Sequence, residues 1–243
     1  MKAISNLHNF LGELPEAVIT ELESRLTQPR TYSDREIIFC GGDSPDYLFQ
    51  IVSGEVALSN SSADGQEIIL TKFLAGDWFG DTGIMDGNPR INTAIAAGDT
   101  VLRALSRADF LDLCERHTEI LRQFSIMQSH HVRMLLNLLV DASLLRLPAR
   151  IVRSIQRLLV SSGKQDQKGE YYIECSHEEL ARFVAASRQS TSVELKKLEQ
   201  QGIVRSAYGK IYVIDRDALN KTSDDLTDFE PIAARYSDGD DDA

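Results

Sequence analysis

Residues 176–202 read SHEELARFVAASRQSTSVELKKLEQQG and carry the signals of two short helices joined by a tight turn. Ser176 and Glu179 have the spacing of a capping box, in which each side chain accepts a hydrogen bond from the other residue's backbone amide. Leu180 and Val184 then supply an apolar face for the helix that this box begins. The stretch is therefore expected to start with a short, capped helix that packs along one side.

A second helix is expected after a break between small residues. Ser187 can cap a helix over 188–201, and Gly202 supplies the left-handed residue at which helices commonly end. Two short helices joined by about three residues are the pattern of a helix-turn-helix. Two β-rich runs at 203–206 and 210–214 flank a turn and predict a hairpin, so the unit is expected to be winged.

The amino end of the second helix in such a unit projects its side chains into the major groove of DNA. Arg188 and Gln189 occupy that end, and these residue types form paired hydrogen bonds with guanine and adenine edges. Val193, Leu195 and Leu198 are expected to face inward. The residues placed for phosphate contacts are Ser176, His177, Ser187, Lys196 and Lys210. The alternative is an αα-hairpin with solvated charges, but the caps, turn and hairpin together favour double-stranded DNA.

The charge distribution points to the same segment. The chain has 243 residues and a net charge of −11, which by itself argues against a polyanionic partner. Residues 145–220, however, hold 13 Lys and Arg against 9 Asp and Glu, whereas residues 1–144 and 221–243 are both acidic. If a polyanion binds, it therefore binds residues 145–220. The acidic stretch 221–243 has few large apolar residues and is expected to be mobile.

Composition excludes several other classes of protein. No apolar run approaches the roughly 18 to 20 residues that cross a bilayer, so no membrane association is expected. Cys40, Cys114 and Cys175 are few and far apart, which argues against a disulfide framework or an iron–sulfur cluster and for a reducing cytoplasm. There is no nucleophile–base constellation, metal-ligand spacing or Walker loop, so the sequence does not indicate an enzyme.

The first half of the chain has a different sequence pattern, in which β-rich runs dominate. Residues 1–28 have helical spacing and predict one or two short helices. From residue 31 to 106, short β-rich runs alternate with Gly and Asp turn signals at roughly ten-residue spacing, which predicts a sandwich or a jelly roll. The expected strands are 36–40, 47–53, 55–59, 67–73, 93–97 and 100–106.

A long helix over 118–142 should join the two halves, after a short helix over 109–115. Its seam steps by three and four residues in the rhythm of a coiled coil. The seam residues are Leu121, Phe124, Gln128, His131, Leu135, Leu138 and Ala142. As an ordinary amphipathic helix it would pack on its own domain, whereas as a coiled coil it would make a homodimer, and we favour the dimer. Pro148 marks the end of this segment.

These features predict an α+β chain of four parts. Residues 1–117 form an effector-sensing jelly roll with short N-terminal helices, and residues 118–144 form a dimerisation helix. Residues 145–220 form a winged helix-turn-helix, and residues 221–243 form the acidic tail.

The order of these parts resembles the cyclic AMP receptor protein/FNR family of bacterial transcription regulators. The resemblance covers about residues 30–214. It rests on Ile51-Val52-Ser53-Gly54-Glu55-Val56, Gly76-Asp77-Trp78-Phe79-Gly80-Asp81, Met85-Asp86-Gly87-Asn88-Pro89-Arg90, Ser187-Arg188-Gln189 and Leu195-Lys196-Lys197-Leu198-Glu199. The resemblance implies a homodimer that binds a palindromic operator, with RNA polymerase as a further partner.

The resemblance also implies an effector site, and here the residues depart from the family's pattern. In members that bind cyclic nucleotides, a Glu holds the ribose hydroxyl where this chain has Asp81. Arg90 matches the Arg that pairs with the cyclic phosphate, but Ile91 replaces a hydroxyl donor to that phosphate. Leu135 and Leu136 stand where hydroxyls would meet the adenine.

The candidate effector residues are therefore Gly80, Asp81, Thr82, Gly83, Arg90, Ile91, Leu135 and Leu136. Cyclic AMP, another small effector and no effector all remain open. Four cysteines hold the iron–sulfur cluster of the family's oxygen-sensing branch, and the three cysteines of this chain do not match that arrangement.

The operator contacts depart from the family's best-known pattern as well. The resemblance aligns Arg188, Gln189 and Val193 with Arg, Glu and a second Arg. Because Gln also offers a donor and Val offers only apolar contact, a different half-site is expected. The alternative function is a cyclic-nucleotide-binding regulatory subunit that acts through a protein partner.

Overall fold

The computed structural model describes residues 1–5, 7–65, 67–224 and 232–235. The chain divides into two compact units, one of residues 8–130 and one that combines residues 1–7 with 131–243. The division falls within the long helix, between His130 and His131, rather than at either of its ends. After the roles that the sequence predicts, we refer to the first as the sensor unit and to the second as the DNA-binding unit.

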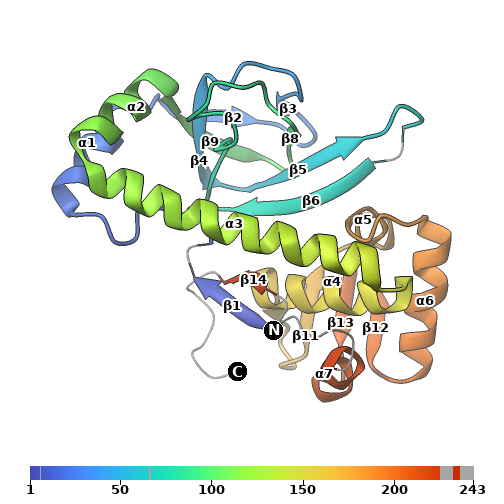
Figure 1. Cartoon of the computed structure of the whole chain (residues 1–243). Helices are drawn as coiled ribbons and strands as arrows, with labels where there is room; N and C mark the ends of the chain where they lie inside the picture. Colours follow the sequence, from blue (N-terminus) through green and yellow to red (C-terminus); the bar gives the residue numbers. More distant parts are fainter. Residues whose placement is uncertain (6, 66, 225–231, 236–243) are drawn as a thin grey trace. The chain divides into compact units, whose positions relative to one another are not determined.

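The sensor unit contains two four-stranded antiparallel sheets (Figure 1). Their strands are β2 Arg30–Tyr32, β3 Ile37–Phe39, β4 Tyr47–Ser53, β5 Glu55–Ser61, β6 Glu67–Leu74, β7 Trp78–Phe79, β8 Thr93–Ala96 and β9 Thr100–Ser106. The first strand of this series pairs with the last, the second with the next to last, and so on inward: β2 with β9, β3 with β8, β4 with β7 and β5 with β6. This nested pairing is that of a jelly roll, as predicted.

The sandwich core is aromatic. Phe79 stacks at 5.2 to 6.0 Å, centroid to centroid, against Phe39, Phe49 and Phe73. The predicted strands at 47–53 and 100–106 have the bounds found in the structure. Asp46 and Gly54 flank the first strand, whereas Asp99 precedes the second and its last residue, Ser106, caps the helix that follows. The short strands β2 and β7 were not predicted.

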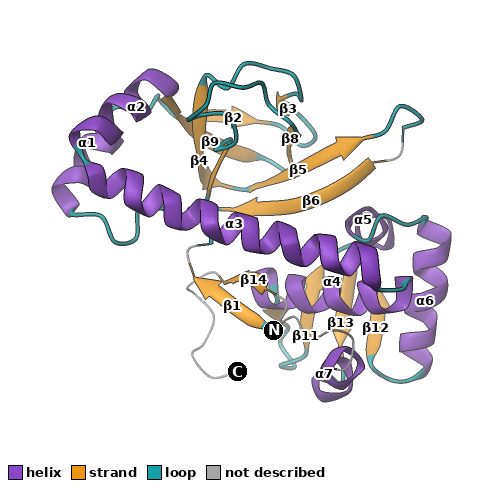
Figure 2. Cartoon of the chain, in the orientation of Figure 1, coloured by secondary structure: helices purple, strands orange, loops and turns teal. Residues whose placement is uncertain are grey.

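Two helices close one end of the sandwich, where they lie side by side (Figure 2). Helix α1 spans Glu16–Ser24, and helix α2 spans Arg107–Arg116. Arg25 joins them through ion pairs with Asp109 at 3.3 Å and Asp112 at 2.7 Å. Phe10, Trp78 and Phe110 belong to the apolar core beneath.

The long helix α3 spans Thr118–Leu144, two residues beyond the predicted end. Its exposed apolar face differs from the predicted seam. Phe124 is buried in the core of the sensor unit, so it is not available to a second chain. The exposed large apolar residues farther along are Val132, Leu135, Leu136 and Leu139, which share one face, and Leu144 at the end of the helix. Val132 and Leu139 thus replace His131 and Leu138 on the exposed face.

The DNA-binding unit is a helical domain with a small sheet (Figure 2). Its helices are α4 Leu147–Ser162, α5 His177–Phe183, α6 Arg188–Gln200 and α7 Arg216–Asp224. Its antiparallel sheet has the order β10 Lys164–Gln165, β11 Tyr171–Glu174, β13 Lys210–Val213 and β12 Val204–Ala207. Pro148 lies in the first turn of α4, where its missing amide hydrogen has no helical partner to lose.

The two ends of the chain differ from expectation. Strand β1, Lys2–Ser5, pairs in parallel with β14, Ile232–Arg235, so part of the region 1–28 is a strand and not a helix. Ile232 and Ala233 are buried, so the expectation of a mobile segment is wrong at β14, and Lys221 lies within α7. The rest of the predicted tail, 225–231 and 236–243, lies outside the described residues.

Candidate nucleic-acid interface and sensor pocket

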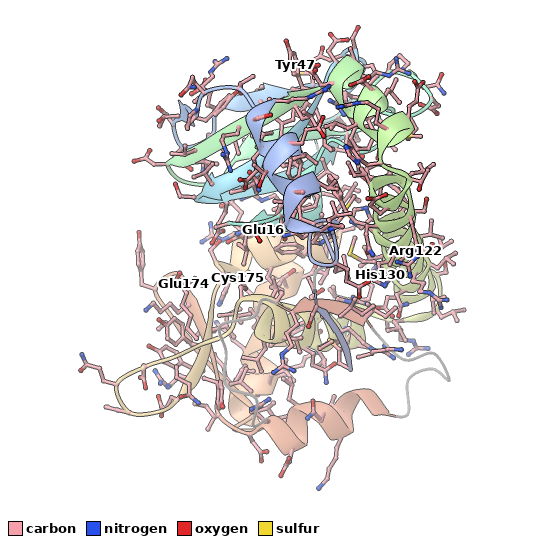
Figure 3. All side chains as sticks on the ribbon, turned by 90° about the vertical axis from the view of Figure 1, so that its left-hand side faces the viewer. Glu16, Tyr47, Arg122, His130, Glu174 and Cys175 are labelled. Carbon is pink, nitrogen blue, oxygen red and sulfur yellow. The ribbon has the colours of Figure 1, made fainter. Side chains whose placement is uncertain are left out.

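Both helices of the predicted helix-turn-helix begin at the predicted caps. The Ser176 side chain accepts a hydrogen bond from the Glu179 amide at 3.1 Å, and the Glu179 carboxylate accepts one from the Ser176 amide at 3.4 Å. The Ser187 side chain accepts one from the Ser190 amide at 3.0 Å. These caps fix where α5 and α6 start. In Figure 3, Glu174 and Cys175 mark the end of β11, just before α5.

The turn between the helices depends on one unusual backbone conformation. Ala185 has φ of 50°, in the left-handed region that residues with a Cβ atom rarely adopt. The turn is closed by hydrogen bonds from the Ala186 amide to the Ala181 carbonyl and from the Val184 amide to the Leu180 carbonyl. This turn therefore sets the angle between α5 and α6.

Helix α6 presents a polar outer face at its amino end. Thr191, Leu195 and Leu198 are buried, so they hold its inner face against the rest of the unit. Arg188 and Gln189 are exposed, and within the described part of the chain their side chains form no hydrogen bond. Their side chains are thus free to meet a ligand.

Two further predicted residues lie on the same helix. Lys196 is exposed, as expected of a phosphate contact. Val193 is 49% exposed, so its predicted inward orientation is wrong and its predicted position at the operator is accessible. Thr191 is buried instead, because positions 191, 195 and 198 share one face of a helix and position 193 lies on another.

His177 connects three elements of the unit. One ring nitrogen lies 3.0 Å from Ser192 Oγ on α6, and the other lies 3.0 Å from Ser206 Oγ on β12. The Ser206 amide also donates to the Glu199 carboxylate at 2.6 Å, and hydrogen bonding with Ser206 lowers the pKa of Glu199. His177, predicted to contact phosphate, thus has both ring nitrogens engaged in fixing α6 to the wing.

The wing carries cations over aromatic rings. Lys210 Nζ lies 4.2 Å from the centre of the Tyr172 ring, and the Arg205 guanidinium lies 4.0 Å from that of Tyr212. Tyr208, at the tip of the hairpin, is fully exposed. These contacts limit the side-chain freedom of Lys210 while keeping its charge at the surface.

A small pocket, with a cavity volume of about 20 Å³, lies in the sensor unit. Its lining residues are Phe39, Leu58, Phe73, Gly80, Asp81, Thr82, Arg90, Ile91 and Asn92. Five predicted effector residues are therefore brought together: Gly80, Asp81, Thr82, Arg90 and Ile91. Gly83 does not line the pocket, and Leu135 and Leu136 belong to the other compact unit and are about half exposed.

Arg90 is only 5% exposed and points inward. Its Nη1 donates to the Gly80 carbonyl and, at 3.3 Å, to the Thr82 carbonyl, while its Nη2 donates to the Tyr47 carbonyl. Its guanidinium also lies 4.5 Å from the centre of the Phe39 ring. Burial lowers the pKa of Arg90, and nearby carboxylates such as Asp81 oppose that shift.

The loop that carries these carbonyls requires glycine. Gly80 has φ of 82°, and a Cβ atom there would lie 3.1 Å from Arg90 Nη1 and 3.3 Å from the Tyr47 carbonyl. At Gly83 a Cβ atom would lie 2.4 Å from the Asn88 carbonyl. Gly80 therefore allows the close approach of Arg90, and Gly83 allows that of the Asn88 carbonyl.

Asp81 contacts the long helix. Gln128 Nε2 donates to Asp81 Oδ2 at 2.6 Å, so the polar residue predicted for the dimer seam is turned toward the sensor loop. Gln128 was not predicted to join the site. A polar residue within an apolar seam was the available signal, but periodicity alone does not reveal which neighbour it meets.

The three cysteines are separate and unpaired with one another. Burial raises the pKa of the Cys114 thiol to about 11, which disfavours the reactive thiolate. Within the described ranges, no three His, Cys, Asp or Glu side chains gather as a metal site would require. Nor does any described helix combine the length and the apolar character needed to span a membrane.

Comparison with known proteins assigns both units to described families. Residues 29–117 match the cyclic nucleotide-binding domain, and residues 149–222 match the Crp-like helix-turn-helix domain. The two matches occur in the order that the fold shows, with α3 between them.

Curated relatives extend over most of the chain. A cyclic AMP receptor protein of Thermus thermophilus is 30% identical over 215 residues, which are 87% of this chain and 94% of that protein. The cAMP-activated global transcriptional regulator Vfr of Pseudomonas aeruginosa is 27% identical over 189 residues, 76% of this chain and 88% of its own.

Solved structures agree in fold. A CRP-family transcriptional regulator of Thermus thermophilus has a TM-score of 0.68 at 26% identity and covers 80% of this chain and 96% of its own. The c-di-GMP responsive regulator CLP of Xanthomonas campestris has a TM-score of 0.74 at 21% identity, and the match covers 83% of this chain and 100% of that one.

The fold and the exposed end of α6 define a DNA-binding transcription regulator with a sensor domain of the cyclic-nucleotide-binding type. The chain belongs to the cyclic AMP receptor protein/FNR family. Its relatives are regulators of transcription and not enzymes, which favours this function over that of a subunit acting only through a protein partner.

Proposed function

We propose that the chain binds a palindromic operator as a homodimer, with one α6 helix in each of two successive major grooves about 34 Å apart. The observation that carries this proposal is the exposed amino end of α6, where Arg188 and Gln189 have no structural partner within the described residues. If the side chains of Arg188 and Gln189 were buried or bonded to other residues of the chain, their role would be to stabilise the fold.

Three side chains of α6 would read the half-site. Arg188 suits a guanine through two hydrogen bonds, and Gln189 suits an adenine in the same way. Val193 would meet the methyl group of a thymine. Each well-formed bidentate pair contributes roughly 1–3 kcal/mol of discrimination between bases.

Other groups would hold the DNA backbone without reading sequence. The capped amino ends of α5 and α6, at Ser176 and Ser187, direct backbone amides outward, where phosphates bind readily. Lys196 and Lys210 add positive charge on the helix and on the wing. His177 contributes by positioning α6 against β12.

The exposed face of α3 supports the dimer. Val132, Leu135, Leu136 and Leu139 are each about half exposed or more, and they recur at the three- and four-residue steps of a helical seam. A second copy of the same face would cover them symmetrically. Leu139→Asp is expected to yield monomers in sedimentation velocity, while Leu144→Asp, off that face on the same helix, is expected to leave dimers.

Selection of bound duplexes from a random pool tests the DNA function of the full chain. We expect a symmetric motif with two half-sites about one helical turn apart, bound more tightly than random duplex across a range of salt. Sequences recovered without any shared motif would contradict the proposal. RNA polymerase as a further partner, and the cytoplasm as the location, follow from this function and are part of the proposal.

A further inference from the structure

The two terminal nitrogens of Arg90 and the carboxylate of Asp81, which are the charged groups of the sensor pocket, are bonded to the protein itself. Both terminal nitrogens of Arg90 donate to backbone carbonyls of Gly80, Thr82 and Tyr47. A phosphate that paired with this guanidinium would have to replace those hydrogen bonds, and it would do so at a side chain that is only 5% exposed. The anion-binding group of this pocket is therefore already used by the fold.

Asp81 is used in a comparable way. Its Oδ2 accepts a hydrogen bond of 2.6 Å from Gln128 Nε2, which joins the loop after β7 to helix α3 across 47 residues of sequence. A bond to an ionised acceptor is stronger than one between neutral groups. This bond connects the pocket loop to α3 without any added molecule.

Gln128 lies on α3 between the part that is buried in the sensor core and the part that is exposed. Phe124 and Met127, just before it, are buried in the sensor core and hold the helix there. Val132, just after it, begins the exposed apolar face. The Asp81–Gln128 bond thus adds a polar attachment of α3 one residue beyond Met127, toward the face that the proposed dimer uses.

We propose that Gln128 is a positioning residue: its hydrogen bond to Asp81 holds the sensor loop on α3, so that operator binding needs no cyclic nucleotide. This inference rests on the proposed function, because it concerns how the proposed DNA binding is controlled. It also explains why a pocket with Asp81 and Ile91, poorly matched to a cyclic nucleotide, persists beside a complete DNA-binding unit.

The first test measures operator affinity of the full-length protein, freed of any bound nucleotide as checked by mass spectrometry. Cyclic AMP and cyclic GMP at millimolar concentration are expected to change the wild-type affinity by less than about twofold. Gln128→Leu and Asp81→Ala are each expected to weaken operator binding about tenfold, the loss of one strong hydrogen bond. Their binding to random duplex should not change.

Conservative and combined variants separate this role from a general loss of stability. Asp81→Asn keeps an oxygen that accepts from Gln128 and is expected to bind the operator within about threefold of wild type. The double variant Asp81→Ala with Gln128→Leu should bind no more weakly than either single variant, because both remove the same interaction. Additive losses, or a tenfold gain of wild type on cyclic AMP, would overturn the proposal.

Hydrogen exchange supplies a readout that does not need DNA. Amides of α3 around Gln128 should exchange faster in Gln128→Leu and in Asp81→Ala than in wild type or Asp81→Asn. Equal exchange in all four proteins would refute the proposed role of the Asp81–Gln128 hydrogen bond, even if no operator were found. Faster exchange in these two variants of a protein without any operator preference would instead support the role of the Asp81–Gln128 bond and refute the proposed DNA function.

Discussion

Arg90 and Arg188 show how differently the two units of this chain use an arginine. Arg90 is buried, and its terminal nitrogens bond to carbonyls of its own loop. Arg188 is exposed at the start of α6, in a helix that is positioned by a serine cap and a tight turn. The two arginines therefore differ in their use: Arg90 stabilises its own loop, whereas Arg188 lies at the surface on a helix fixed by its cap and turn and stays available to a ligand.

Substitution of the buried arginine gives the largest expected effect on stability. Arg90→Met should lower the free energy of unfolding by roughly 3 kcal/mol, because it leaves buried carbonyls of the loop without a donor. Such a loss corresponds to a fall in Tm of about 6–12 °C for a chain of this size. Calorimetry of the matched variant Arg188→Met should show almost no change, and equal shifts in both variants would contradict the comparison.

Substitutions in the turn between α5 and α6 give the next largest expected effect on stability. Ala185→Val should destabilise the DNA-binding unit by about 2 kcal/mol, because a β-branched side chain is strained at positive φ. Ala185→Gly should stay within about 1 kcal/mol of wild type, since relief of strain offsets the entropy of glycine. Chemical denaturation checks both; if Val is tolerated as well as Gly, the turn does not hold the conformation described here.

The smallest expected effect is on stability at low pH and depends on the carboxylate of Glu199. Because hydrogen bonding with Ser206 lowers the pKa of Glu199 from 4.5, this carboxylate stabilises the folded unit above that pH, and the contribution is lost as pH falls through the lowered pKa. Glu199→Gln keeps an acceptor but no charge. The free energy of unfolding of wild type should therefore exceed that of this variant by about 1 kcal/mol at pH 7, and the difference should disappear as the pH falls through the lowered pKa of Glu199. A difference independent of pH would show that the charge of Glu199 is unimportant.

Local signals in the sequence predicted the DNA-binding unit well. The caps at Ser176 and Ser187 and the left-handed Gly202 concern neighbours in the chain, so their residue types are enough to place the helix ends. Strand β4 was equally well bounded by Asp46 and Gly54, and β9 by the Gly98-Asp99 turn at its start and the α2 cap Ser106 at its end. The family resemblance then indicated which loop would carry the pocket, and five of its predicted residues line it.

Features that depend on distant parts of the chain were missed. The pairing of β1 with β14 joins opposite ends of the sequence, and no local pattern indicates it. Phe124, predicted for the dimer seam, is buried in the sensor core, because periodicity does not distinguish an internal neighbour from a second chain. The roles of His177 and Gln128 depend in the same way on which residues the fold brings near them.

The most direct test of the account compares Arg188→Ala with Lys210→Ala on the selected operator and on random duplex. Arg188→Ala should weaken operator binding by about 1–3 kcal/mol per half-site, with relaxed specificity at one base pair and little change on random duplex. Lys210→Ala should weaken both DNAs alike and reduce the salt dependence. The same loss on both duplexes for both variants would contradict the claim that the exposed end of α6 reads the sequence.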